Sequence, residues 1–444
     1  GKISIDYLDF DKDTEYEELI DNFHFYHNSN PINSIFSLSL EWGIGNNENN
    51  KLSYAAQLGG IIGNEKFTFN EFKEELQKIG ATVDFSNSGN YTGLNITGFD
   101  KYFDETINLA GDFLRTIKVR KEDKKKLKKL IQGSIIERKF EGRETAAKAD
   151  ALKEYAIWGK QSAYLTRPTV KEVKKMSSEL LINQIKDAAG VETNVYYTGN
   201  TPKETVKAMV RKNFIISKNL RDSNSPYVWD KKLNDENMVY FHNDKKAVQS
   251  QIYIIIDGEV MDEKDRHMSN IFNKYFGGSM SGLVFQEIRE FRSLAYSAGG
   301  TYRKPFFFDK TGRFEGYMGT QADKTIDAIE TYMNLLKEMP EKANRMAGIK
   351  TGMLQSLTSS RSNFRGIGST IETWRKQGFK EDPKVMQKEV YENAEFDDLL
   401  EFYKNYIQGR PYTIAIVGNK EKIDFNKLSD YGNIIELKKG DIFN

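Results

Sequence analysis

The first half of the chain changes its hydrophobic spacing in a regular order, from extended runs to helical stretches and back to an extended run. Apolar runs typical of strands cover residues 23–28, 35–43 and 194–198. Between them the spacing predicts helices near 52–62 and 69–79, strands near 83–88 and 92–97, and a series of helices over 102–189. Strands at the ends with helices between them predict an α+β layer: a mostly antiparallel or mixed sheet covered on one face by helices.

The second half repeats markers of the first. Phe25-Tyr-His-Asn28 recurs as Tyr240-Phe-His-Asn243, and Val195-Tyr-Tyr-Thr-Gly-Asn200 matches Ile414-Ala-Ile-Val-Gly-Asn419 at nearly the same offset. Two markers with similar offsets indicate duplication. We therefore expect two tandem homologous domains, 1–221 and 236–444, joined by the polar, turn-rich residues 222–235.

Composition excludes several classes of function. The 444 residues carry a net charge of +1, which gives no field for nucleic acid or an anionic membrane. The chain has no cysteine, and no apolar stretch approaches the roughly 18–20 residues of a membrane helix. We expect a soluble protein of the periplasm or cytoplasm. The chain opens with Gly1 instead of Met, so we also expect it to be a segment of a longer product.

One long motif carries a family resemblance. The run Gly277-Gly-Ser-Met-Ser-Gly-Leu-Val-Phe-Gln-Glu-Ile-Arg289, followed by Glu-Phe-Arg-Ser-Leu-Ala-Tyr296, resembles the glycine-rich loop and helix of insulinase/pitrilysin (M16) metallopeptidases and mitochondrial processing peptidase. The tandem repeat also resembles the half-molecule of that family. The resemblance implies the LuxS/MPP-like metallohydrolase fold for both domains.

The chain departs from the family where zinc would be bound. Zinc-binding members carry His-x-x-Glu-His on the first helix, because two imidazoles four residues apart share one helical face and the glutamate polarises water. Here Tyr54, Gln57 and Leu58 occupy these positions, and none can replace an imidazole ligand. The family's third ligand would fall near Ile135, and we interpret the neighbouring Glu137 as a helix-surface residue. We therefore expect no metal in this chain.

The histidines do not offer another metal site. His24 and His27 lie three apart on a predicted strand, so their side chains point to opposite faces. His242 repeats His27 and is best explained as a duplicated structural position, while His267 is isolated on a predicted helix.

The resemblance assigns a catalytic contribution to Arg289 and Tyr296, which match residues that the zinc-free half donates to the zinc half. A tyrosine hydroxyl can donate to the oxyanion of amide hydrolysis, and a guanidinium can clamp a substrate carbonyl. We expect Arg289 in the last turn of a helix beginning near residue 280, and Tyr296 on an extended segment where it shares a face with Ala298 and Gly300.

Other residues of the motif have less specific roles. Arg292 is expected to bind carbonyls or Glu290 at the helix end. Two interpretations of the glycine-rich loop stay open, a substrate-binding loop or a tight helix start. The residues that would contact substrate in the first case are Gly277, Gly278, Ser279 and Gly282.

Two classes of function follow. In the first, the chain is the zinc-free half of an M16-like zinc endopeptidase that encloses unfolded peptides but is not active alone. Zinc then belongs to the partner half, which is either the preceding part of the same polypeptide or a separate subunit. In the second, the chain is a catalytically silent scaffold subunit descended from processing peptidases.

Overall fold

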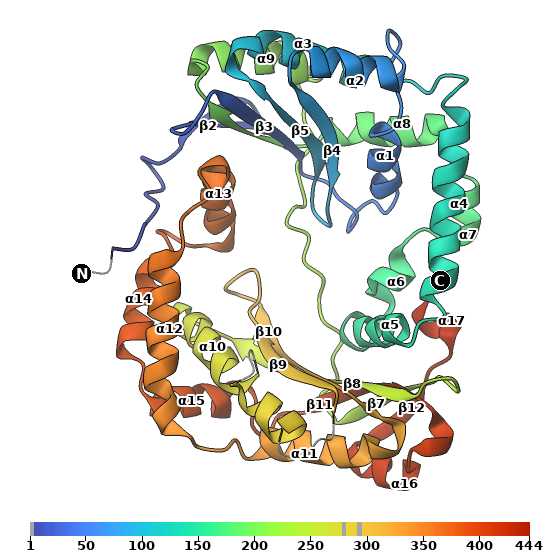
Figure 1. Ribbon diagram of the computed structural model, residues 1–444, viewed down its shortest axis with the longest axis vertical. Coiled ribbons are helices and arrows are strands. Elements are labelled where there is room, and N and C mark those ends of the chain that lie inside the picture. The colour runs from blue at the N-terminus through green and yellow to red at the C-terminus, as the bar shows by residue number, and fades with distance from the viewer. Residues whose placement is uncertain (1–3, 278–280, 291–294) are drawn as a thin grey trace.

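The computed structural model describes residues 4–277, 281–290 and 295–444, with the side chains of residues 289 and 290 outside the description. It contains two six-stranded sheets, one in each half of the chain, at opposite ends of the molecule (Figure 1). Both sheets are mixed, and each carries helices on one face. The predicted α+β class and the duplication are therefore confirmed.

The first sheet has the order β1-β2-β6-β3-β5-β4. Its alternating sequence explains its facing: in β3 the residues Phe36, Leu38, Leu40 and Trp42 are buried toward the helices, while the serines between them point to the other face. The strands are β1 (Glu15–Ile20), β2 (Phe23–Ser29), β3 (Ile35–Trp42), β4 (Thr82–Asn87), β5 (Thr92–Phe99) and β6 (Thr193–Gly199).

The second sheet has the order β12-β7-β11-β8-β10-β9. Its three central strands repeat the first sheet: β7 pairs in parallel with β11 as β2 pairs with β6, and β8 pairs antiparallel with β11 as β3 pairs with β6. The strands are β7 (Met238–Asn243), β8 (Gln249–Val260), β9 (Ser297–Arg303), β10 (Thr311–Gln321), β11 (Tyr412–Gly418) and β12 (Asn433–Glu436).

The helices of each half build a core against their own sheet. In the first half these are α1 (Leu52–Gly59), α2 (Phe69–Lys78), α3 (Phe103–Thr116), α8 (Ser178–Ala188) and α9 (Lys203–Phe214). In the second half they are α10 (Glu263–Phe276), the π-helix η3 (Phe285–Glu290), α11 (Thr325–Lys337), α12 (Met346–Ser359), α14 (Lys384–Asn393) and α15 (Phe396–Tyr406).

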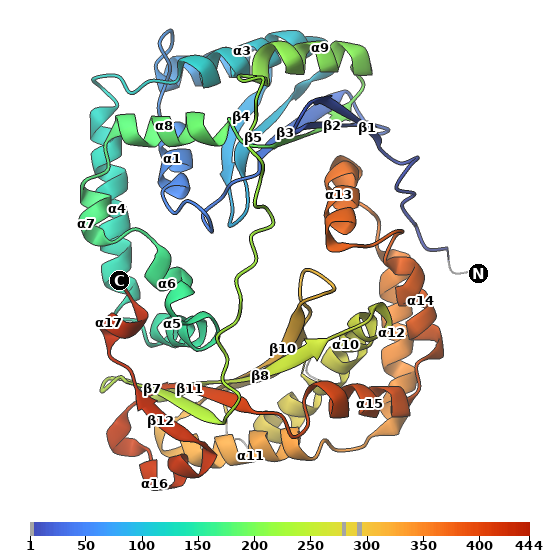
Figure 2. The ribbon, with the colours of Figure 1, turned by 180° about the vertical axis from the view of Figure 1, so that it is seen from behind.

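Two helices cross between the halves, which the sequence did not predict. Helix α5 (Thr145–Trp158) lies on the face of the second sheet opposite that sheet's own helices. Helix α13 (Ile367–Gln377) lies against β2 of the first sheet, where a Cβ added at Gly368 would lie 3.1 Å from the Cβ of Tyr26, a tight contact. The two crossings lie on opposite sides of the molecule and join the sheets (Figures 1 and 2).

The remaining helices connect these layers. Helix α4 (Lys124–Glu141) spans from the first half toward the second, and α6 (Ala163–Thr166) and α7 (Val170–Lys174) lead back (Figure 2). Near the carboxyl end, α16 (Phe425–Leu428) and α17 (Lys439–Ile442) complete the second half. Across the described ranges, no helix combines the length and the apolar character that crossing a membrane requires.

Three elements differ from the predictions. The edge strands β1 and β12 were not predicted, because both are short and rich in exposed polar residues. The helix expected from residue 280 to Arg289 is π-helical from Phe285 onward. π-Helical segments are rare and occur frequently at functional sites.

Candidate functional site

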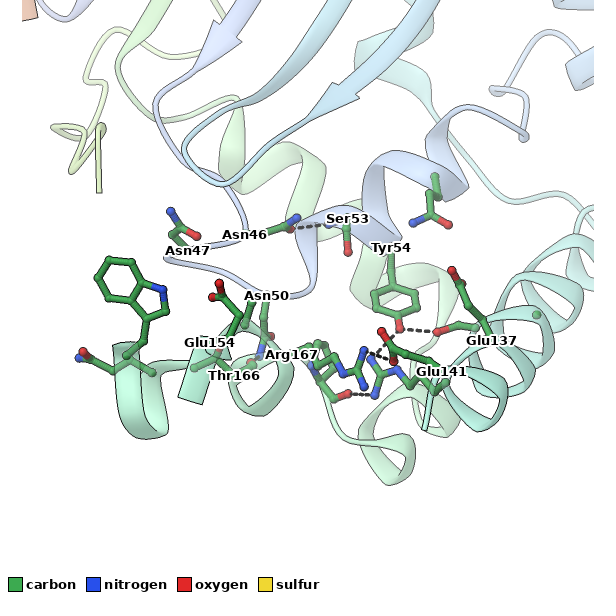
Figure 3. Close-up of a pocket in the computed structure, with 18 of the residues that line it drawn as sticks. Asn46, Asn47, Asn50, Ser53, Tyr54, Glu137, Glu141, Glu154, Thr166 and Arg167 are labelled. Atoms are coloured by element: carbon green, nitrogen blue, oxygen red, sulfur yellow. Dashed lines mark hydrogen bonds and ion pairs between the residues drawn. The ribbon is translucent and has the colours of Figure 1, made fainter. Parts of the chain in front are cut away.

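The three positions that the resemblance assigned to a degenerate metal motif lie on α1 and differ in burial. Tyr54 is 6% exposed and Leu58 is fully buried in the core, whereas Gln57 is exposed. The Tyr54 hydroxyl lies 2.6 Å from Ser134 Oγ and accepts a hydrogen bond from Arg138 Nη2 at 3.0 Å (Figure 3). Tyr54 therefore ties α1 to α4 at the point where a zinc-binding relative would hold an imidazole.

A polar cavity of about 730 Å³ opens beside this tyrosine, and we call it the Tyr54 cavity. Its walls come from α1 and the loop before it, from α4, from the end of α5 with the residues that follow it, and from the segment that joins the two sheets (Figure 3). The polar side chains of the lining include Asn46, Asn50, Ser53, Tyr54, Gln57, Glu137, Glu141, Glu154, Gln161 and Arg167.

Most charges of the Tyr54 cavity are already engaged. Arg167 pairs with Glu141 at 2.7 Å, and Arg138 donates to the Pro168 carbonyl as well as to Tyr54. Burial raises the pKa of Glu154. Glu137 is exposed on α4, as expected for a helix-surface residue.

The donor set of the Tyr54 cavity does not fit zinc. A zinc site needs several nitrogen, sulfur or carboxylate ligands converging on one point. The motif positions offer a phenol already held by Ser134 and Arg138, an exposed amide, and a core leucine. Among the described residues, no three His, Cys, Asp or Glu side chains are placed to hold a metal ion.

The histidines occupy separate structural positions. His24 contacts Tyr16 on one face of β2 and His27 stacks on Tyr197 on the other, which confirms that the pair cannot share a ligand. His242 lies on β7, the counterpart of β2, where its Nδ1 is 2.9 Å from the Leu437 carbonyl. His267 is buried within α10, far from these strands in the sequence.

Tyr296 lies immediately before the edge strand β9 and is accessible. Its side chain is 57% exposed, and its hydroxyl accepts a hydrogen bond from Gln321 Nε2 at 3.0 Å. Its backbone N–H donates to the Gly319 carbonyl at 2.8 Å, so the residue is anchored to β10 while its ring stays in contact with solvent. A phenol held in this way can reach a group supplied by another surface.

The neighbours of Tyr296 face elsewhere than the sequence suggested. Ala298 packs against the core of the second half, and a side chain at Gly300 would meet Phe314 and the Tyr332 hydroxyl. The small size of these residues makes room for the helix layer of the same half, not for a peptide. Side chains alternate between the two faces only within β9, which begins at Ser297. Tyr296 precedes this strand, so its side chain does not follow the alternation.

The other motif residues fall partly outside the description. Gly277 ends α10 and lies against the backbone of Gly300, where any Cβ would clash, and Gly282 is buried. Gly278, Ser279 and Arg292 lie outside the described residues. The backbone of Arg289 belongs to η3, and its side chain lies outside the description.

The structure places the two groups of predicted residues in different halves. Tyr54, Gln57 and Leu58 belong to the first half, while Tyr296 and the backbone of Arg289 belong to the second. Sequence reasoning missed the contributions of α5 and the joining segment to the Tyr54 cavity, including Trp158 and Trp229. These residues are far from α1 in the sequence, and no local motif marks them.

Comparisons with known proteins agree with this architecture. Residues 192–350, which include the glycine-rich motif, match the family described as peptidase M16 inactive domain. The chain is similar to the uncharacterized zinc protease YmxG of Bacillus subtilis, with 21% identity over 310 residues that cover 67% of this chain and 72% of that protein.

Solved structures share the fold across nearly the whole chain. A peptidase M16 inactive domain from Pseudomonas fluorescens is 11% identical with a TM-score of 0.68, over 92% of this chain and 98% of that one. The periplasmic protease PqqL from Escherichia coli is 12% identical with a TM-score of 0.70, over 94% of this chain but 47% of that one. Residues 192–350 thus match the peptidase M16 inactive-domain family, and the chain shares its fold along nearly its whole length with a solved inactive domain of that family.

Proposed function

We propose that this chain is the zinc-free half of an M16-like zinc endopeptidase. It helps to enclose an unfolded peptide and donates Arg289 and Tyr296 to the transition state of peptide-bond hydrolysis, which takes place at zinc in a partner half. The zinc half either precedes this chain in one polypeptide or is a separate subunit. The segment is divided near residues 222–235 into two homologous domains.

The accessible hydroxyl of Tyr296 is the observation that carries the proposal. The Tyr296 side chain is 57% exposed at the edge of its sheet, so its hydroxyl is accessible to a group that another surface supplies. In hydrolysis of an amide, the carbonyl oxygen gains negative charge, and a positioned hydroxyl donor stabilises that charge. Gln321 can orient the hydroxyl by donating to its oxygen, which leaves the phenolic proton for the substrate.

The residues at the degenerate motif positions support a separation of roles, in which the partner half binds zinc and this half does not. Tyr54 and Leu58 are built into the packing of α1, so this half has replaced metal ligands by structural contacts. The match to PqqL supports a partner, because this chain covers 47% of that protein and leaves length for a second half of similar size.

The test is a mixture of this chain with a partner half that carries His-x-x-Glu-His, or a longer polypeptide that contains both halves. Cleavage of a flexible fluorogenic peptide is measured for the wild type, Tyr296→Phe and Tyr54→Phe. We expect Tyr296→Phe to lower kcat by about 10²- to 10³-fold, the effect of removing one oxyanion donor.

Tyr54→Phe is the matched control, because it removes a hydroxyl from the degenerate motif instead of the exposed strand edge. We expect less than a roughly twofold change in kcat for it, and co-elution of both variants with the partner half in size-exclusion chromatography. Equal activity of wild type and Tyr296→Phe would leave assembly as the role of this chain.

A further inference from the structure

A second cavity, of about 370 Å³, lies in the other half at the base of the crossing helix α13, and we call it the His267 cavity. It is enclosed by α10, by the connection between β9 and β10, by the last turn of α13, and by the start of α14. It shares no lining residue with the Tyr54 cavity.

His267 contributes an unpaired imidazole to this cavity. Its side chain is 2% exposed, and neither ring nitrogen has a hydrogen-bond partner among the described residues. A Glu263 carboxylate oxygen lies 3.8 Å from Nε2, beyond hydrogen-bond distance. A buried polar group without a partner costs about 1–3 kcal/mol, so an imidazole kept in this state is unexplained by packing alone.

Arg266, the preceding residue, brings a buried positive charge. It is 3% exposed, and its guanidinium donates to the Pro305 carbonyl at 2.8 Å and lies 4.5 Å from the Phe308 ring. In the described part of the chain no carboxylate forms an ion pair with it; Glu263 acts on it only from a distance. Backbone carbonyls of residues 305–307 accept its hydrogen bonds, so what this guanidinium adds to the wall is a positive charge that no carboxylate neutralises at short range.

Lys304 adds a cation at the rim. Its ammonium donates to Asn270 Oδ1 at 3.0 Å, which leaves two of its three donors for other groups. The lining contains no acidic residue. Trp374, Phe379 and Phe306 supply apolar surface to the same cavity, and the Phe379 ring stacks on His267 at 6.5 Å between centroids.

We propose that the His267 cavity binds a carboxylate attached to an apolar group. His267 and Lys304 donate to the carboxylate oxygens, and the charge of Arg266 stabilises the anion through the cavity wall. Trp374 and Phe379 contact the apolar part. A small carboxylic acid and the carboxyl terminus of a peptide share this chemistry, and the site is independent of any role of the chain in peptide hydrolysis.

The probe is N-acetyl-phenylalanine, with N-acetyl-phenylalaninamide as its neutral counterpart. Titrations are followed through the imidazole ¹⁵N signals, which are few because the chain has four histidines. We expect a saturable shift of the His267 signals with the acid and none with the amide. Burial lowers the pKa of His267 to about 3, and a bound carboxylate raises it by favouring the imidazolium. A pentapeptide ending in phenylalanine tests the second source of the ligand.

Three variants separate binding from folding. Lys304→Met should weaken binding of the acid by roughly 10- to 100-fold, the value of a charge-assisted hydrogen bond. Lys310→Met, on the same β9–β10 connection but paired with Asp230, should leave the affinity unchanged. His267→Phe should abolish binding yet keep or raise the melting temperature, because it removes the unpaired nitrogens.

Three results would overturn the proposal. The first is equal binding of acid and amide. The second is a saturable response to inorganic phosphate with none to N-acetyl-phenylalanine or the pentapeptide. The third is a loss of melting temperature in His267→Phe with unchanged binding in Lys304→Met, which would assign a structural role to the imidazole.

Discussion

Helices α5 and α13 each pack on the sheet of the other half of the molecule, but the main contacts that hold them there differ in kind. Helix α5 meets the second sheet through apolar groups: Ala151, Leu152 and Ile157 pack against Ile255 of β8 in a cluster that also includes residues of β11 and α17. Helix α13 meets the first sheet through polar groups. The Tyr26 hydroxyl donates to Glu372 at 2.6 Å, and Lys376 donates to the Tyr91 hydroxyl at 3.2 Å.

The receiving strands explain this difference. Strand β8 carries the run Ile252-Tyr-Ile-Ile-Ile256, which is apolar on both faces, so its sheet needs cover on both sides. Strand β2, which receives α13, alternates the core residues Phe23 and Phe25 with His24, Tyr26 and Asn28, so its second face carries polar groups. The burial of Glu41 raises the pKa of its carboxyl. The α5 contact adds one ion pair, Lys148 with Asp244 at 2.8 Å, to its apolar interface. We infer that it depends less on salt and pH than the α13 contact, which rests on ionisation and hydrogen-bond geometry.

The largest expected effect is on the apolar crossing. Leu152→Ala should lower the free energy of unfolding by about 2–5 kcal/mol, because Leu152 is fully buried and its removal leaves a cavity between α5 and the second sheet. Urea denaturation followed by circular dichroism measures the change. Ile136→Ala on the exposed face of α4 is the control and should stay within about 0.5 kcal/mol. A small effect of Leu152→Ala would mean that α5 is not required to cover the second sheet.

The polar crossing should respond to loss of one hydroxyl. Tyr26→Phe removes the donor to Glu372 and should cost about 1.5–3 kcal/mol, the range for a hydrogen bond to a charged acceptor. Hydrogen exchange should rise in α13 and stay unchanged in α5. Tyr155→Phe in α5, where the ring packs against Tyr240, is the matched control and should leave exchange in both helices unchanged. Parallel loss of protection in both helices would show that the crossings are coupled.

Acid should act on the base of α13 through His267. Because the pKa of His267 is about 3 in the folded protein and about 6.5 when unfolded, the unfolded state binds more protons between these values. Stability is therefore complete above pH 6.5 and falls with decreasing pH by up to about 1.4 kcal/mol per unit toward pH 3. His267→Phe should remove this part of the slope, as measured by urea denaturation at several pH values. An identical slope in the variant would contradict the assignment.

Part of the fold could be predicted from local pattern. Strands β2, β3 and β6 and helices α1 and α2 fall close to the expected ranges, since their hydrophobic periods match the burial of each residue. The position of Tyr54, Gln57 and Leu58 on one helix was also predictable, because the apolar spacing of residues 52–62 is local. The partners of Tyr54 on α4 were not, since Ser134 and Arg138 are distant in the sequence and carry no distinguishing pattern.

Residue type and spacing alone determined the duplicated sheets, the lack of imidazoles on α1, and the motif that contains Arg289 and Tyr296, since each is a property of a short stretch. Only the tertiary structure decided that α5 and α13 exchange sheets, that Gly300 faces Tyr332 while Tyr296 stays exposed, and that the unpaired imidazole of His267 lies beside Arg266 and Lys304 in one cavity. These outcomes depend on which distant surfaces meet, and that is set by burial of apolar area and satisfaction of polar groups over the whole molecule.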